Sequence, residues 1–164
     1  MDKNFVDLLS ALNSHGARYL VVGGYAVSYH SQPRGTRDMD IFYSTDKENT
    51  VAVFQALAEF GAPVSGLGPE DFADPERMFR FGRPPYQVDF LPVLTGVTFE
   101  DAWRGRVMVA VMDGIEAPYI SVDLLKENKR AFGRLQDLAD VEALEHCEQV
   151  IREEAEEKRK EKKD

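Results

Sequence analysis

The segment 20–42, with the sequence LVVGGYAVSYHSQPRGTRDMDIF, restricts the fold of this chain more than any other part of it. It begins with an apolar run that ends abruptly at two glycines, and the next six residues carry apolar and aromatic side chains at helical spacing. A polar loop follows and leads through Asp-Met-Asp into the apolar residues Ile41 and Phe42. This order predicts a strand, a glycine turn, a short helix over residues 25–30, a loop and a second strand.

Two features of this segment suggest chemistry. Gly23 and Gly24 let another group approach their backbone closely, and the amides at the start of the following helix suit a phosphate. Asp38 and Asp40 would face the same side of a strand, where two carboxylates repel each other unless a cation lies between them. Mg²⁺ prefers one or two carboxylates together with substrate phosphates. The segment therefore predicts a phosphate site beside a Mg²⁺ site, with an ordinary turn and a solvated loop as the alternatives.

The glycine pair, the short helix and the Asp-x-Asp pair before apolar residues resemble the nucleotidyltransferase superfamily with a DNA polymerase β-like core. The form GGYAVSYH…RGTRDMDIF is most similar to small bacterial stand-alone members, near the antibiotic nucleotidyltransferases and the AbiEii-type toxin group. The likeness covers residues 20–42 and continues more weakly at residues 86–91 and 126–144. It implies an α/β (α+β) fold: a mixed, twisted β-sheet with flanking helices and a C-terminal helical pair.

Asp89 supplies a third carboxylate, on a predicted strand over residues 86–91. Tyr86, Val88 and Phe90 would share one face of this strand, and Asp89 would lie on the other. In the superfamily that the chain resembles, a third acidic residue follows the Asp-x-Asp pair on a neighbouring strand, and Asp89 matches it in order and context. We therefore expect Asp89 to be a metal ligand or a general base; an exposed position on a half-buried edge strand is the alternative.

The resemblance implies Mg²⁺-dependent transfer of a nucleoside monophosphate from an NTP to an acceptor hydroxyl, with release of pyrophosphate. Asp38, Asp40 and Asp89 would be the catalytic residues and hold two Mg²⁺ ions, and Gly23 and Gly24 would bind the nucleotide. The acceptor could be a small molecule, a protein or tRNA, and a homodimer is left open. Two other functions could use the same fold: a toxin or antitoxin of a toxin–antitoxin module, and a non-catalytic nucleotide-binding module.

Basic side chains would offset the charge of the leaving pyrophosphate, and we assign Arg37 and Lys129 to nucleotide binding. For Lys129 the role is implied by the resemblance, because a lysine at this place in related small nucleotidyltransferases can reach the triphosphate. Lys129 lies near the end of a predicted helix, where the helix dipole already favours cations, so a structural role is the alternative. Asp137 and Asp140 in the next helix are expected to hold Arg134 or a helix interface and not a metal.

The 164 residues suit one domain, which we expect to span residues 1–151, followed by a charged helix extension or tail over residues 152–164. The single cysteine, Cys147, excludes an internal disulfide, and no signal peptide or membrane-spanning run is evident. These features predict a cytoplasmic protein without a membrane partner. The net charge of -9 argues against broad nucleic-acid binding. Five basic side chains could still form a local basic groove: Arg34, Arg37, Lys129, Arg130 and Arg134.

The rest of the chain gives a regular pattern of elements. Helices are expected over residues 3–14, from the 44–46 region to Gly61, over 98–103 and 122–132, and from 135 onward. Strands are expected over residues 78–81, 86–91, 107–112 and 115–120. Turns are predicted at residues 82–85 and at Asp113 and Gly114, and a loop with one helical turn at residues 61–77. The last helix would bury one stripe, formed by Leu138, Val141, Leu144 and Ile151.

Overall fold

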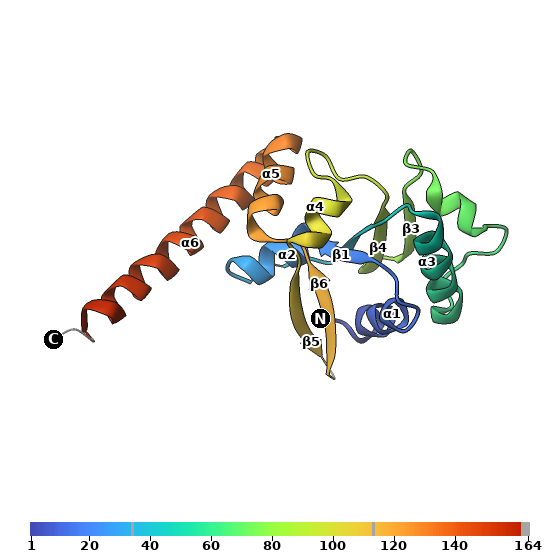
Figure 1. Cartoon of the computed structure of the whole chain (residues 1–164), viewed down its shortest axis with the longest axis horizontal. Helices are drawn as coiled ribbons and strands as arrows, with labels where there is room; N and C mark the ends of the chain where they lie inside the picture. The colour runs from blue at the N-terminus through green and yellow to red at the C-terminus, as the bar shows by residue number, and fades with distance from the viewer. Residues whose placement is uncertain (34, 113, 162–164) are drawn as a thin grey trace.

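The computed structural model describes residues 1–33, 35–112 and 114–161 of the chain (Figure 1). Arg34, Asp113 and residues 162–164, which the sequence analysis assigns to a basic groove, a turn and the tail, lie outside them. The helices are α1 (Lys3–Ser14), α2 (Gly23–His30), α3 (Lys47–Phe60), the 3₁₀ helix η1 (Pro69–Ala73), α4 (Phe99–Arg104), α5 (Val122–Phe132) and α6 (Leu135–Glu161). The strands are β1 (Tyr19–Val22), β2 (Met39–Tyr43), β3 (Phe79–Arg83), β4 (Tyr86–Leu91), β5 (Val107–Met112) and β6 (Ile115–Tyr119).

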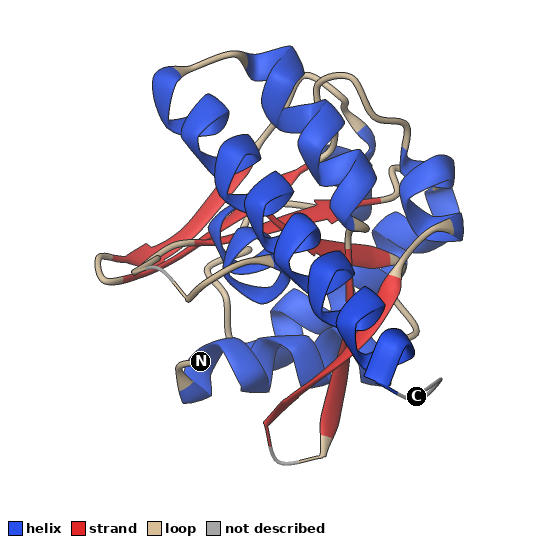
Figure 2. Cartoon of the chain, turned by 90° about the vertical axis from the view of Figure 1, so that its left-hand side faces the viewer, coloured by secondary structure: helices blue, strands red, loops and turns tan. Residues whose placement is uncertain are grey.

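Within the described residues, six strands form one sheet in the order β3-β4-β2-β1-β6-β5. The pairs β2–β4 and β1–β6 are parallel, and the other neighbouring pairs are antiparallel. Figures 1 and 2 show that the β5–β6 hairpin extends beyond the rest of the molecule. Helices flank this mixed sheet, and α5 packs against α6 as a C-terminal pair. The predicted α/β fold class is therefore confirmed.

The two faces of the sheet carry different elements because side chains alternate along each strand. On one face Tyr43 of β2 contacts Phe72 of η1, with ring centroids 6.2 Å apart. On the other face Phe42 packs edge-on against Phe99 of α4, with centroids 5.2 Å apart. Asp40, two residues before Phe42, shares the second face. The alternation of β2 thus places a carboxylate on the side opposite η1.

Helix α1 shows how local sequence and burial agree. Phe5, Leu8, Leu9 and Leu12 recur at intervals of three and four and are buried against the sheet and α3. The Asp2 side chain accepts a hydrogen bond from the amide of Asn4, which is the expected N-cap contact. Fully burying such side chains contributes about 2 kcal/mol each, so this one face accounts for the position of the helix.

Several boundaries differ from the prediction. Helix α2 begins at Gly23 and not after the glycine pair, so the two glycines form its first turn. Strand β3 continues through Arg83, which leaves Pro84 and Pro85 as the connection to β4. Both changes lengthen regular elements at the expense of the predicted turns.

The predicted buried stripe of α6 is correct only near its middle. Val141 and Leu144 are buried, but Leu138 is 44% and Ile151 61% exposed. Figure 1 gives the reason: only the first part of α6 lies against α5 and α2, and the helix then projects away from the body. In Figure 2 the helix runs across the front of the strands. Among the described residues, no helix has the length and apolar character required to cross a membrane.

Candidate active site

A cavity of about 590 Å³ opens where β1 ends and β2 begins, opposite α5 and the start of α6. Its lining includes every residue that the sequence analysis assigned to the site: Gly23, Gly24, Arg37, Asp38, Asp40, Asp89 and Lys129. These residues come from parts of the chain that are more than 100 positions apart. The fold therefore gathers the predicted carboxylates, glycines and basic side chains around one space.

The carboxylates lie on neighbouring strands. Asp40 of β2 and Asp89 of β4 are register partners in a parallel pair, and Asp38 is exposed one residue before β2 begins. Burial, together with the nearby charges of Asp89 and Asp38, raises the pKa of Asp40 to about 6, although Lys129 and a hydrogen bond from the Gly24 amide act against the rise. The carboxylates are thus crowded enough to repel one another.

The glycine pair fits tightly beneath this group. Gly23 has φ of +59°, a conformation that residues with a side chain rarely adopt. A Cβ atom at this position would lie 2.7 Å from Cγ of Asp40. The amide of Gly24 donates a hydrogen bond to Asp40. Glycine at position 23 is therefore required both by the backbone and by the close approach of the carboxylate.

Arg80 is a member of this group that the sequence analysis missed. It lies opposite Asp89 in the antiparallel β3–β4 pair, and its guanidinium donates from Nε to Oδ1 and from Nη2 to Oδ2 of Asp89, both at 2.7 Å. These hydrogen bonds and the charge of Asp89 raise the pKa of Arg80. The bidentate contact fixes both oxygens of Asp89 in one orientation.

Lys129 is held by two buried carboxylates. Its Nζ lies 2.9 Å from Oδ1 of Asp137 and 2.9 Å from Oδ2 of Asp140, and all three side chains are less than 10% exposed. Arg134 donates from Nε to Oδ2 of Asp137 at 2.6 Å. Burial acts to raise the pKa of Asp137, but the hydrogen bonds from Arg134 and Lys129 outweigh it, and the pKa is lowered. Asp137 and Asp140 thus join α5 to α6, as predicted.

The carboxylates at the cavity offer few ligands for a divalent cation. No group of three or more histidine, cysteine, aspartate or glutamate side chains among the described residues has an arrangement that could hold a metal ion. Asp38 and Asp40 provide carboxylate oxygens at the same cavity, which suits an ion that takes its remaining ligands from phosphates and water. Both oxygens of Asp89 are engaged by Arg80 instead. Asp38 and Asp40 are therefore the residues that could hold a Mg²⁺ ion, and Asp89 could contribute only through the lone pairs that its bonds to Arg80 leave.

Two histidines and Arg130 have contacts outside this group of residues. His15 Nε2 lies 2.6 Å from Glu59, and His30 Nε2 lies 2.7 Å from the carbonyl oxygen of Ile120. Arg130 pairs with Glu145 of α6, away from the cavity. Of the predicted basic groove, Arg37, Lys129 and Arg134 line the cavity, and Arg130 does not.

No family model matches the chain, and no curated protein matches it. Among solved structures it resembles the crystal structure of the lincosamide antibiotic adenylyltransferase LnuA with lincomycin bound. The two share 16% sequence identity with a TM-score of 0.54, and the match covers 88% of this chain and 96% of the other. At this identity the likeness concerns the fold: the chain has a nucleotidyltransferase-like fold.

Proposed function

We propose that this chain transfers a nucleoside monophosphate from an NTP to an acceptor hydroxyl and releases pyrophosphate. The observation that carries the proposal is the single cavity that collects Asp38, Asp40 and Asp89 with basic side chains beside the glycine pair. Transfer reactions of this type depend mainly on alignment and on the stabilisation of charge. A cavity lined by both carboxylates and cations supports this chemistry better than the chemistry of a covalent nucleophile.

The cations would act on the triphosphate. Arg37 and Arg134 line the cavity with exposed side chains, so each can turn toward a phosphate oxygen. Lys129 uses two contacts for Asp137 and Asp140, and an ammonium group has three donors. Positive charge at these positions would favour departure of the pyrophosphate.

The carboxylates would act on the acceptor and the cation. Asp89 is proposed to accept the proton of the acceptor hydroxyl, because each carboxylate oxygen keeps a further lone pair beside its bond to Arg80. Asp38 and Asp40 would hold Mg²⁺ together with the phosphates of the nucleotide. When bound, the ion neutralises phosphate charge and strengthens pyrophosphate as a leaving group.

A small hydroxylated molecule is the acceptor class that we propose. The structural neighbour is an antibiotic adenylyltransferase with lincomycin bound, and a cavity of about 590 Å³ is of a size that suits small molecules. The net charge of -9 disfavours tRNA as the acceptor. A relation to the antibiotic nucleotidyltransferases therefore ranks above the toxin–antitoxin alternative, which growth arrest on expression would favour instead.

The test is an assay for nucleotide transfer to a panel of hydroxylated antibiotics that includes lincomycin. Purified protein is incubated with each NTP, Mg²⁺ and one antibiotic, and the mass gain of the antibiotic and the release of pyrophosphate are measured. We expect one donor and acceptor pair to give both signals. Asp40→Asn should abolish them, whereas Asp7→Asn, an exposed carboxylate of α1 outside the cavity, should leave them unchanged.

Two results would contradict the proposal. The first is transfer by Asp40→Asn at the rate of the unaltered protein. The second is a folded protein that binds no NTP in the presence of Mg²⁺, which would exclude the non-catalytic nucleotide-binding module as well.

A further inference from the structure

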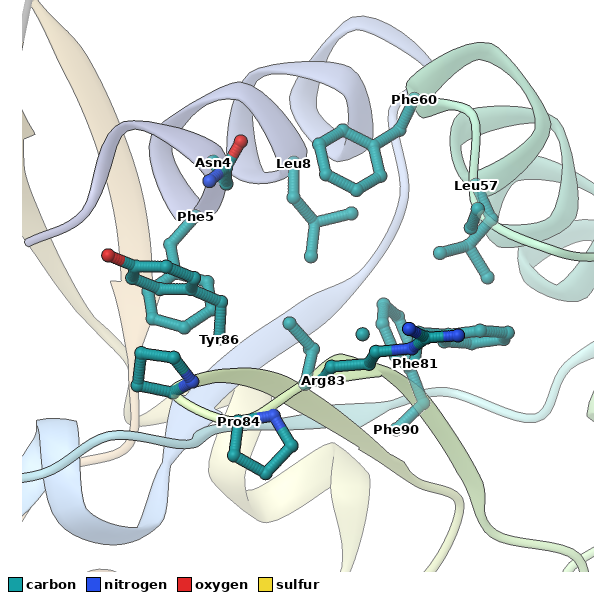
Figure 3. A pocket seen from close by; sticks show the side chains of 14 residues that line it. Asn4, Phe5, Leu8, Leu57, Phe60, Phe81, Arg83, Pro84, Tyr86 and Phe90 are labelled. Carbon is teal, nitrogen blue, oxygen red and sulfur yellow. The ribbon is translucent and has the colours of Figure 1, made fainter.

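A second cavity, of about 480 Å³, lies between α1, α3 and the β3–β4 hairpin (Figure 3). Its inner wall is formed by buried apolar side chains, Leu8 of α1, Leu57 of α3, and Val88 and Phe90 of β4. Figure 3 shows these elements enclosing the space from different sides. Its volume is within the range of cavities that bind small organic molecules.

Aromatic rings form much of the remaining wall. Phe5 and Tyr86 pack edge to face, with centroids 6.4 Å apart, at one end, and Phe60 lies at another. Tyr86 is 46% and Phe60 37% exposed, although both are large and apolar. When an apolar ligand covers rings that are partly open to water, apolar surface is removed from water, and this favours binding.

Arg83 is the single formally charged residue among the fourteen that line this cavity. It is exposed, and Figure 3 shows its side chain running along the edge that the hairpin forms. None of the lining residues carries a carboxylate, so the formal charge of the lining is positive on a chain whose net charge is -9. An arginine at the mouth of an apolar space is the arrangement that recognises a carboxylate attached to an apolar body.

The cavity is separate from the candidate active site. Val88 and Phe90 face it, whereas Asp89, between them on the same strand, lines the other cavity. The sheet therefore stands between the two spaces. A ligand in the second cavity would not be a nucleotide or an acceptor in reach of the aspartates.

We propose that this second cavity binds a small anionic amphiphile, a molecule with a ring-bearing apolar body and one carboxylate. The body would lie between Leu8, Leu57 and Phe90, with the rings of Tyr86 and Phe60 at its sides. The carboxylate would accept hydrogen bonds from Arg83. This binding does not depend on the proposed transferase activity.

The test uses three probes that share one apolar body: 2-naphthoate, the neutral 2-naphthamide and the cation 2-naphthylmethylammonium. Each is titrated calorimetrically into the full chain. We expect 2-naphthoate to bind about fivefold more tightly than the amide, which corresponds to one solvent-exposed charge pair, and the cation to bind more weakly than both. Arg83→Gln should bring the affinities of the acid and the amide together.

Matched variants separate this site from the rest of the molecule. Ala62→Phe adds a ring to the lining and should abolish the binding of both 2-naphthoate and 2-naphthamide, with circular dichroism used to show that the variant is folded. Arg104→Gln removes an exposed arginine of α4 that does not line the cavity and should leave binding unchanged, as should Asp40→Asn in the active site.

Three results would overturn the proposal. Equal affinity for the three probes would remove the role of Arg83. Unchanged binding of 2-naphthoate by a folded Ala62→Phe variant would place the ligand elsewhere. Loss of binding in Asp40→Asn would place it in the active site. None of these results bears on nucleotide transfer, which the mass assay measures separately.

Discussion

At the scale of single residues, Gly23 carries the strictest requirement in the site. Gly23→Ala would force a side chain into a backbone with φ of +59° and against Asp40. The backbone strain alone costs about 1–2 kcal/mol, and displacement of the carboxylate should lower the transfer rate about a hundredfold. Thermal unfolding and the transfer assay would measure the two effects.

Gly61 gives the matched control for this prediction. It also has positive φ, +86°, at the C-terminus of α3, but a Cβ atom there would meet nothing within 4 Å. Gly61→Ala should therefore lose stability through backbone strain alone and keep full activity. If the two alanine variants behave alike, the contact between position 23 and Asp40 has no functional consequence.

The contact between Arg80 and Asp89 leads to a second prediction at this scale. Arg80→Gln removes a bidentate partner and leaves Asp89 free to rotate beside Asp40. We expect kcat to fall about a hundredfold through misorientation, with little change in KM for the NTP. Arg104→Gln is the control. A variant at position 80 with normal kcat would show that the orientation of Asp89 is unimportant.

Arg80 also shows why part of the site was hidden in the sequence. The motif residues Asp38 and Asp40 are two positions apart in the chain, so their order and spacing were enough to predict them. The partner of Asp89 depends on hairpin register, and a turn placed at residues 82–85 gives the wrong register. With the connection at Pro84 and Pro85, Arg80 falls opposite Asp89. A shift in turn length thus conceals a contact between strands.

At the scale of elements, the junction of α5 and α6 depends on buried charge. Lys129→Met would leave Asp137 and Asp140 without their shared cation, and breaking such a buried ion pair costs about 3 kcal/mol. Lys126→Met is the matched control on the same helix. It removes contacts to the more exposed Asp123 and Glu148 and should cost about 0.5 kcal/mol.

Chemical denaturation of the two lysine variants gives the comparison directly. A larger loss for Lys126→Met than for Lys129→Met would contradict the view that burial decides the strength of this junction. A loss below about 1 kcal/mol for Lys129→Met would contradict it as well, since this is the range of solvent-exposed pairs.

In α6 the spacing of apolar residues does not by itself predict which side chains are buried. Apolar residues of α6 recur at helical spacing, and the pattern alone cannot show where the neighbouring elements end. Leu138 is exposed because the buried face near the start of α6 is occupied by the polar pair Asp137 and Asp140. Ile151 is exposed because the helix has already left the body there (Figure 1). Tertiary contacts decide both positions, and they are absent from a local pattern.

At the scale of the whole molecule, the projecting part of α6 should be dispensable for folding. Side chains 151–160 are all exposed, so a chain that ends at Ile151 loses little buried surface. We expect its unfolding free energy to stay within about 0.5 kcal/mol of the full chain, as for most exposed substitutions. A chain that ends at Asp140 also loses the buried side chains of Val141 and Leu144. This second truncation should cost about 4 kcal/mol from those two side chains alone.

Urea denaturation of the two truncated proteins would test where the folded unit ends. If the chain that ends at Asp140 is as stable as the full chain, the part of α6 after Asp140 adds nothing to the core. A large loss on removing residues 152–164 would show instead that the projecting helix is held by contacts in solution. In that case the predicted boundary at residue 151 would be wrong, and the assembly of the chain with a second copy would be the first property to measure.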